Sequence, residues 1–399
     1  MLISNVQKKQ LLILPSAQNT LGGTLVTLSL MSKGFADCGM GDKLKILACS
    51  GSLLENYLKE KGSGKYLQII QAGNQKEFLQ KSLEFIHQQP KDFPLLLDNC
   101  VQREVVPTLT ILTPKLRWSG RPVYFFFHDL SLSYNHLGYL GRKVFFSLLK
   151  PMAICNSHYT ASHIKNFVSP VKGVLYQPVD LEKFNSNLSE KTPPEKLKPI
   201  LDKGEKLILT PSRIKLSGDM NDKNLFALLP LLVELKRRGY KYHGVIVGED
   251  KTPNQIASRS LQEEATKLGV ADCFSILPPT FEIENYYKYA DVVVTLAPRE
   301  PFGRTVVEAI ACGVPVVGSN TGGISEILNH FAPEWTVAPN DFKAAADTII
   351  NIANNPNSRN LIAQGQLWIK TECSLQGYAR KIMEITQLTP TNELIYNEN

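Results

Sequence analysis

Short, continuous runs of apolar residues alternate with helix-length amphipathic segments along almost the whole chain. A strand that is apolar at every position is buried on both faces, which is typical of a parallel sheet covered by helices on each side. In the first half of the chain this pattern predicts strands at 11–14, 45–49, 66–70, 94–98, 122–127, 152–155 and 171–176. Segments 24–36, 76–87, 138–150 and 159–167 fit the crossover helices between them.

A second series of the same kind begins near residue 206. It predicts strands at 206–210, 242–247, 273–277, 291–295 and 315–319, and helices at 224–238, 255–268, 304–312 and 341–353. The stretch between the two series, 185–203, is polar, contains prolines and lacks periodicity, so we interpret it as a linker. We therefore predict an α/β fold with two doubly wound, Rossmann-like domains, 1–184 and 185–375, and a C-terminal helix and tail, 376–399, that pack back toward the first domain.

Composition limits the classes of function. The chain of 399 residues carries 44 Lys and Arg against 37 Asp and Glu, a net charge of +7 that suits anionic ligands or an anionic membrane surface. The basic residues are mostly dispersed, which argues against a nucleic acid partner. The seven cysteines are scattered and lack metal-ligand spacing, which indicates a reducing compartment.

We expect no secretory leader at the start of the given sequence. Its apolar run at 11–14 is shorter than the roughly 7–15 residues of a signal-peptide core. Nowhere does the sequence reach the roughly 18 apolar residues of a spanning helix. We expect a cytoplasmic protein. Contact with the inner face of a membrane is an additional alternative.

The densest group of candidate residues lies in 297–327, where a loop after a predicted strand leads into a predicted helix. The backbone N–H groups of Gly303, Arg304 and Thr305 open this helix and form a candidate anion site. Gly303 lacks a Cβ, so that a phosphate oxygen can approach closely, while Thr305 adds a hydroxyl and Arg304 a counter-charge. A second turn at 322–323 offers another group of N–H donors.

Two glutamates flank this anion site. Glu300 lies in the loop and Glu308 in the helix, so they are not an i,i+4 pair. Carboxylates accept hydrogen bonds from sugar diols, which suits a ligand with sugars on either side of a diphosphate. The alternative is that Glu308 pairs with Arg304 one turn away and that Glu300 is a solvated loop charge.

The motif Glu300-x7-Glu308, within PFGRTVVEAIACGVPVVGSNTGGISEI, resembles the signature of GT-B glycosyltransferases of family 4, which are mostly retaining. The resemblance is close over 290–327 and looser from 11 to about 385. It implies two Rossmann-like domains that face each other across a cleft. It also implies that Glu308 binds the nucleotide ribose and Glu300 the donor sugar. The implied substrate-binding turn that holds the diphosphate or positions the sugar comprises Pro301, Phe302, Gly303, Arg304 and Thr305.

Two basic residues after the strand at 206–210 extend the resemblance. The family usually has Gly-Arg at this point, followed by a lysine a few residues later. This chain has Ser212-Arg213 and then Lys223, so we assign Arg213 and Lys223 as catalytic residues that clamp the diphosphate. Lys215 competes for the role of the phosphate lysine. The alternative for each lysine is a solvent-exposed charge.

Further positions also fit the family. Gly22 and Gly23 match a Gly-Gly loop that approaches the donor phosphate or the acceptor, although a plain tight turn is the alternative. Gly248 matches a glycine turn whose backbone approaches the nucleotide. His128 ends a predicted strand and could donate to a sugar hydroxyl, whereas a structural His–Asp pair, with Asp129 next in the sequence, is the alternative.

These residues predict transfer of a hexosyl unit from a nucleoside diphosphate sugar to a glycan or lipid-linked saccharide, with retention of configuration. The sequence contains no Asp-x-Asp pair that would indicate a site for a divalent cation. We therefore expect neither a metal nor a cofactor. The alternatives are another GT-B enzyme, such as an epimerase or phosphorylase, or a non-catalytic nucleotide-sugar-binding subunit. Residues 139–149, with Lys115, Arg117, Trp118 and Arg121, suggest a basic aromatic surface for a membrane, or else an ordinary amphipathic helix.

Overall fold

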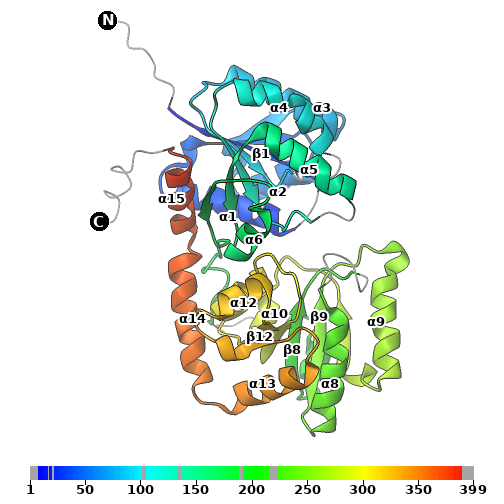
Figure 1. The fold of residues 1–399 in the computed structure, drawn as a ribbon. Helices are drawn as coiled ribbons and strands as arrows, with labels where there is room; N and C mark the ends of the chain where they lie inside the picture. Colours follow the sequence, from blue (N-terminus) through cyan, green and yellow to red (C-terminus); the bar gives the residue numbers. More distant parts are fainter. Residues whose placement is uncertain are drawn as a thin grey trace, which may run out of the picture. The chain divides into compact units, whose positions relative to one another are not determined.

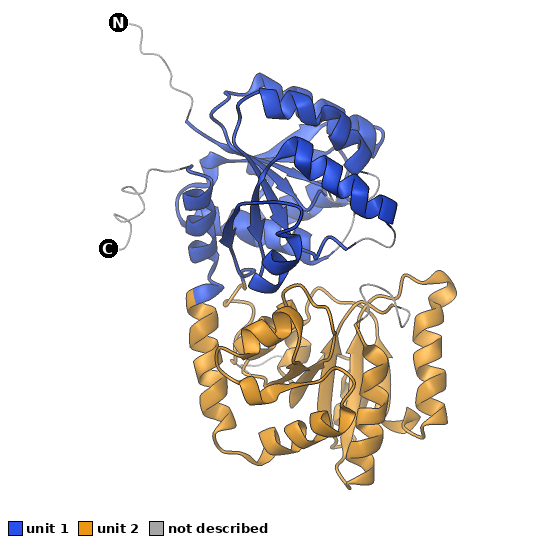
Figure 2. Ribbon diagram, in the orientation of Figure 1, with its two compact units in different colours: residues 1–178, 372–399 blue, residues 179–371 orange. Residues whose placement is uncertain are grey.

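The protein is described by a computed structural model, which places residues 8–16, 18–19, 22–100, 105–132, 136–187, 192–215 and 223–388. The chain forms two compact units, one of residues 1–178 with 372–399 and one of residues 179–371 (Figure 2). The boundary therefore lies before 179 rather than after 184, because Lys183 and Phe184 contact the second unit. The Lys183 ammonium donates to the Phe281 carbonyl at 2.7 Å, and the Phe184 ring lies 6.1 Å from the ring of Tyr287.

The first unit contains a seven-stranded sheet in which all neighbouring strands are parallel, in the order β3-β2-β1-β4-β5-β6-β7. The strands are β1 (Leu11–Pro15), β2 (Leu44–Cys49), β3 (Leu67–Ile70), β4 (Leu95–Asp98), β5 (Val123–Phe127), β6 (Met152–Cys155) and β7 (Val171–Val174). The β1, β4 and β5 strands are buried at every position, as expected for a sheet covered on both faces.

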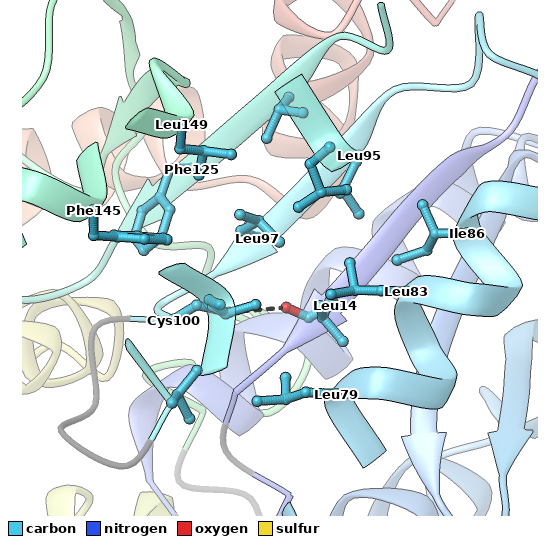
Figure 3. Packing of buried hydrophobic residues seen from close by; sticks show 14 of the residues in the cluster. Leu14, Leu79, Leu83, Ile86, Leu95, Leu97, Cys100, Phe125, Phe145 and Leu149 are labelled. Atoms are coloured by element: carbon cyan, nitrogen blue, oxygen red, sulfur yellow. Dashed lines mark hydrogen bonds between the residues drawn. The ribbon is translucent and has the colours of Figure 1, made fainter. Parts of the chain in front are cut away.

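Helices cover both faces of this sheet. One layer packs on the cluster that includes Leu14, Leu97 and Phe125, and consists of α3 (Gln75–Gln88), α4 (Val106–Trp118), α5 (His136–Leu149) and α6 (His158–Ile164). Figure 3 shows this packing, in which the Cys100 thiol also lies 3.4 Å from the Leu14 carbonyl. The opposite layer consists of α1 (Gly23–Asp37), α2 (Leu53–Glu60) and the C-terminal α15 (Leu375–Ile385). The helix α15 packs along α1, where Gly34 leaves room for the Leu375 backbone.

The second unit contains a six-stranded parallel sheet in the order β10-β9-β8-β11-β12-β13. Its strands are β8 (Lys206–Pro211), β9 (Tyr242–Val247), β10 (Phe274–Leu277), β11 (Val292–Thr295), β12 (Val316–Ser319) and β13 (Thr336–Val337). Its helices are α7 (Lys198–Leu201), α8 (Leu228–Arg237), α9 (Ile256–Lys267), α10 (Glu284–Tyr287), α11 (Arg304–Ala311), α12 (Gly322–Leu328), α13 (Phe342–Asn354) and α14 (Ser358–Glu372). The prediction of an α/β fold built on two parallel sheets is confirmed.

Each sheet has one point at which its strand order reverses. The strand order reverses between β1 and β4 in the first unit and between β8 and β11 in the second. Loops that leave the carboxyl ends of two such strands diverge to opposite faces of the sheet, which opens a crevice where ligands of this fold class bind. Candidate site residues should therefore follow these four strands.

All seven cysteines are free thiols, and five of them are buried. None of the helices within the described ranges has the length and apolar character needed to cross a membrane.

Candidate functional site

An ion pair joins the two loops that diverge from the centre of the six-stranded sheet. Lys223 follows β8 and Glu300 follows β11, and the Lys223 ammonium contacts the Glu300 carboxylate. Only 21% of each side chain is exposed, so this pair is largely shielded from water. Glu300 is therefore not the solvated loop charge of the alternative interpretation.

Asn224 fixes the position of Lys223, a role that the sequence analysis missed. Its side-chain amide donates to the Leu296 carbonyl at 3.2 Å and to the Pro339 carbonyl at 2.7 Å. Its backbone is left-handed, with φ of 53°, a conformation that asparagine tolerates better than most residues. The only signal in the sequence is the asparagine directly after the lysine.

Gly303 places the start of α11 beside this ion pair. It precedes the helix with φ of 102°, which favours glycine, and its carbonyl accepts the first helical hydrogen bond, from the Val306 amide at 2.9 Å. The first N–H groups of a helix have no acceptor within the helix, so the start of α11 presents donors and a positive dipole end. Arg304 and Thr305, both half-buried, are the first two residues of this turn.

The turn at Gly322 and Gly323 supports the Glu300 loop. The Gly323 amide donates to the Glu300 carbonyl at 2.8 Å, so it is not the ligand donor that the sequence suggested. A Cβ on Gly323 would lie 2.4 Å from the Phe302 carbonyl oxygen. Phe302 itself is buried, and Pro301 is half-buried beside it. These contacts assign the two glycines to loop packing.

Glu308 is buried within α11. Its Oε2 accepts from the Tyr287 hydroxyl at 3.1 Å, and its Oε1 lies 3.8 Å from the Arg304 guanidinium. The i,i+4 pair of the alternative interpretation is thus present, but in a buried setting. Burial raises the pKa of Glu308, and the nearby Arg304 charge offsets part of this rise. Tyr287 could not be predicted as a partner of Glu308, because no local pattern links two residues 21 positions apart.

Three further candidates surround the end of β8. Arg213 is exposed, whereas Lys215 is half-buried. Gly248 follows β9, and a Cβ there would lie 1.7 Å from the Ser212 carbonyl oxygen. Close packing of the β8 and β9 ends therefore explains this glycine, and its contact with a nucleotide stays a prediction.

In the first unit, His128 pairs with Asp98 rather than with its neighbour Asp129. His128 Nε2 lies 2.7 Å from Asp98 Oδ1, at the ends of β5 and β4, and both side chains are buried. Its Nδ1 lies 3.4 Å from the Gln177 side-chain nitrogen. Asp129 instead accepts from the Ser131 amide at 2.8 Å. Both ring nitrogens of His128 thus have partners within this unit, and its action on a sugar hydroxyl stays a prediction.

Gly22 and Gly23 begin α1 after β1. Gly22 has an extended backbone, and a Cβ there would meet no described atom within 4 Å. Neither strain nor packing against those atoms therefore calls for glycine at Gly22.

Comparison with known proteins relates most of the second unit to one family of enzymes. Residues 194–367 match the model of the family "Glycosyl transferases group 1". This match covers less than half of the chain. The matched segment contains Arg213, Lys223, Glu300 and Glu308.

Two of the individual relatives match about a quarter to a third of this chain. A D-inositol 3-phosphate glycosyltransferase of Saccharomonospora viridis is 34% identical over 109 residues, 27% of this chain and 25% of the relative. A lipopolysaccharide core biosynthesis mannosyltransferase of Rhizobium meliloti is 29% identical over 131 residues, 32% of this chain and 35% of the relative. The chain thus matches between a quarter and about a third of the length of these relatives.

Solved structures resemble almost the whole chain. Anabaena HepE in complex with UDP has a TM-score of 0.76 and 18% identity, and the alignment covers 95% of this chain and all of that one. Sucrose-phosphate synthase of Thermosynechococcus elongatus has a TM-score of 0.70 and 15% identity, with 95% and 98% covered. At such identities the likeness establishes the fold, and the predicted GT-B fold is confirmed.

Proposed function

We propose that this protein transfers a hexosyl unit from a nucleoside diphosphate sugar to an acceptor hydroxyl of a glycan or lipid-linked saccharide, with retention of anomeric configuration. The observation that carries the proposal is the ion pair of Lys223 and Glu300, which joins the two diverging loops of the segment that matches the glycosyl transferases group 1 model, beside the start of α11. The crevice at such a point is where open α/β sheets bind nucleotides.

The diphosphate of the donor would be held by positive charge. Lys223 supplies an ammonium, the exposed Arg213 supplies a guanidinium, and the start of α11 supplies N–H donors and its dipole. These groups stabilise the negative charge that develops on the leaving diphosphate. In this proposal they carry out that task without a metal ion.

The two glutamates would hold the sugars at either end of the diphosphate. Glu308 is buried, and burial raises its pKa by disfavouring the charged carboxylate. Hydrogen-bond donors from a ligand would favour that charged form. Two ribose hydroxyls would supply such donors in place of water. Glu300, now held by Lys223, would accept from the hydroxyls of the donor hexose once the ammonium turns to the phosphate.

Retention is proposed to occur on one face of the sugar. A double displacement needs a carboxylate beneath the anomeric carbon, and neither Glu300 nor Glu308 is assigned that role. The leaving phosphate oxygen instead accepts the proton of the acceptor hydroxyl as the new glycosidic bond forms. UDP-glucose is the first donor to test, because HepE has been solved in complex with it.

A donor-dependent product assay tests the proposal. The protein is incubated with UDP-glucose and a panel of saccharide acceptors, and the release of UDP and the anomeric configuration of the product are measured. Glu300→Gln should slow transfer by orders of magnitude, whereas Glu334→Gln, at an exposed position of the same unit, should not. Phosphate-dependent cleavage of a glycan would indicate a phosphorylase instead of a transferase. Donor binding without any product across the panel would indicate a non-catalytic nucleotide-sugar-binding protein.

A further inference from the structure

The basic excess of the chain comes from one segment of the first unit. Residues 105–179 contain eight Lys and Arg and a single acidic residue, Asp129, whereas the rest of the chain carries 36 basic and 36 acidic residues. The basic residues are dispersed along the chain, and the positive charge of this segment comes from its lack of acidic residues. Asp129 follows β5 and accepts from the Ser131 amide, so the helices α4 and α5 contain no acidic residue at all.

The same two helices expose large apolar side chains. Exposed fractions are 78% for Ile111, 82% for Trp118, 79% for Leu137, 54% for Leu140, 44% for Val144 and 47% for Leu148. On α5 the apolar residues recur at positions i, i+3, i+7 and i+11, which places them along one side of the helix. On α4, Ile111 and Trp118 lie two turns apart on one side, with Lys115 between them.

Both stripes face away from the sheet. The helices α4 and α5 pack against each other and cover the same face of the seven-stranded sheet, through Leu109 and Leu116 on α4 and through Phe145 and Phe146 on α5 (Figure 1). The exposed stripes lie on the sides of the two helices turned away from these buried residues. The outer surface of this layer thus combines apolar side chains with basic ones; we call it the α4–α5 surface.

We propose that the α4–α5 surface docks on an anionic lipid bilayer. The apolar stripe of α5 would enter the boundary between headgroups and acyl chains, and Trp118 would lie at the headgroup level, where its amphipathic ring is favoured. Lys115, Arg117 and Lys143 would contact the anionic headgroups. This inference does not depend on the proposed reaction.

Charge favours a bilayer over a second copy of the chain. In a two-fold symmetric dimer the α4–α5 surface of one copy would contact the α4–α5 surface of the other, so the basic residues of the two copies would face each other. Such like-charge contacts disfavour association. An anionic bilayer complements both the charge and the apolar stripe.

Vesicle co-sedimentation of the full chain tests this docking. The protein should sediment with vesicles of phosphatidylcholine mixed with phosphatidylglycerol, and less with phosphatidylcholine alone. Replacing Leu140 and Val144 together by serine should lower the partition coefficient by about tenfold or more. Lys143→Gln should lower it about fivefold, because one lysine near an anionic surface contributes about that factor.

Matched variants on other helices provide the controls. Leu367→Ser on α14 and Lys343→Gln on α13 replace exposed residues of the same types and should leave partitioning unchanged. Thermal melting should be the same for all variants, because the side chains are exposed. The proposal is overturned if the native chain stays in the supernatant with anionic vesicles, or if the α5 variants partition like the native chain. A dimer in sedimentation velocity that Leu140→Ser dissociates would assign the surface to a second copy instead.

Discussion

The Lys223 ammonium contacts the Glu300 carboxylate, although 76 residues lie between them in the sequence. The pair joins the loops that follow β8 and β11, the two strands between which the strand order reverses. An anionic ligand that enters this crevice competes with Glu300 for Lys223. In the proposed reaction this ion pair would have to open before Lys223 reaches the donor diphosphate.

Substitution of Lys223 and of Lys215 should show which of the two lysines binds the diphosphate. Lys223→Met removes a charge-assisted hydrogen bond to the diphosphate, a contact of roughly 1.5–3 kcal/mol, and should weaken UDP binding about 10- to 100-fold. Lys215→Met should change UDP binding by much less. Isothermal calorimetry with UDP measures both, and a larger loss for Lys215→Met would move the phosphate lysine to position 215.

Glu308→Gln should stabilise the free protein at neutral pH and weaken donor binding. The substitution removes a buried charge but keeps an oxygen that can accept from Tyr287, so we expect a gain of about 1 kcal/mol in the free energy of unfolding. A carboxyl group whose pKa is raised in the folded protein stabilises the folded state fully at pH values below its ordinary pKa, near 4.3. This stabilisation is lost as the pH rises through the raised pKa. The gain of Glu308→Gln over the native chain should therefore vanish as pH falls toward about 4.

Urea unfolding of both proteins across this pH range measures that difference. A stability difference that does not change with pH would show that Glu308 is not ionised in the free protein. Thermal shift with UDP, run in parallel, should show a smaller shift for the variant than for the native chain.

Substitution of Gly323 and of Gly22 by alanine tests which of the two glycines is required by close packing. Gly323→Ala places a Cβ 2.4 Å from the Phe302 carbonyl oxygen, and should cost roughly 1–3 kcal/mol and displace the Glu300 loop. Gly22→Ala meets no described atom within 4 Å, and should change stability by less than about 0.5 kcal/mol. If Gly22 approaches a substrate, as the family resemblance implies, its variant should nevertheless lose transfer activity. Equal melting temperatures of the two variants would contradict the packing role of Gly323.

The partner of His128 can be tested by removing each candidate acid. Asp98→Ala leaves a buried ring nitrogen without its acceptor, and should cost roughly 1–3 kcal/mol. Asp129→Ala removes an acceptor for the Ser131 amide in a loop, and should cost about 0.5 kcal/mol. Chemical unfolding of the two variants provides the comparison, and a larger cost for Asp129→Ala would refute the observed pairing.

Much of the fold could be predicted because the strands are continuous apolar runs. The strands Met152–Cys155 and Tyr242–Val247 begin and end where the sequence pattern predicts. The helix α4 escaped prediction because it contains two prolines, and Pro114 lies inside it, which usually argues against a helix. The helix α14 escaped because few of its residues are buried, so its apolar periodicity is weak.

The candidate site was predictable only where its residues are neighbours in sequence. Gly303, Glu300 and Glu308 belong to one local motif, and the structure places them around the start of α11. The partners Lys223, Tyr287 and Asp98 depend on which strands lie side by side, which no local pattern encodes. For that reason the sequence offered only the adjacent Asp129 as an acid for the alternative His–Asp pair, whereas strand pairing brings Asp98 to His128.

The most direct test of the proposed function is a structure of the protein with UDP-glucose bound. We expect the diphosphate to lie against the N–H groups at the start of α11, and we expect Lys223 to have left Glu300 for a phosphate oxygen. We also expect Glu308 within about 3 Å of the ribose hydroxyls. A nucleotide bound elsewhere, with the ion pair of Lys223 and Glu300 intact, would contradict the proposed function.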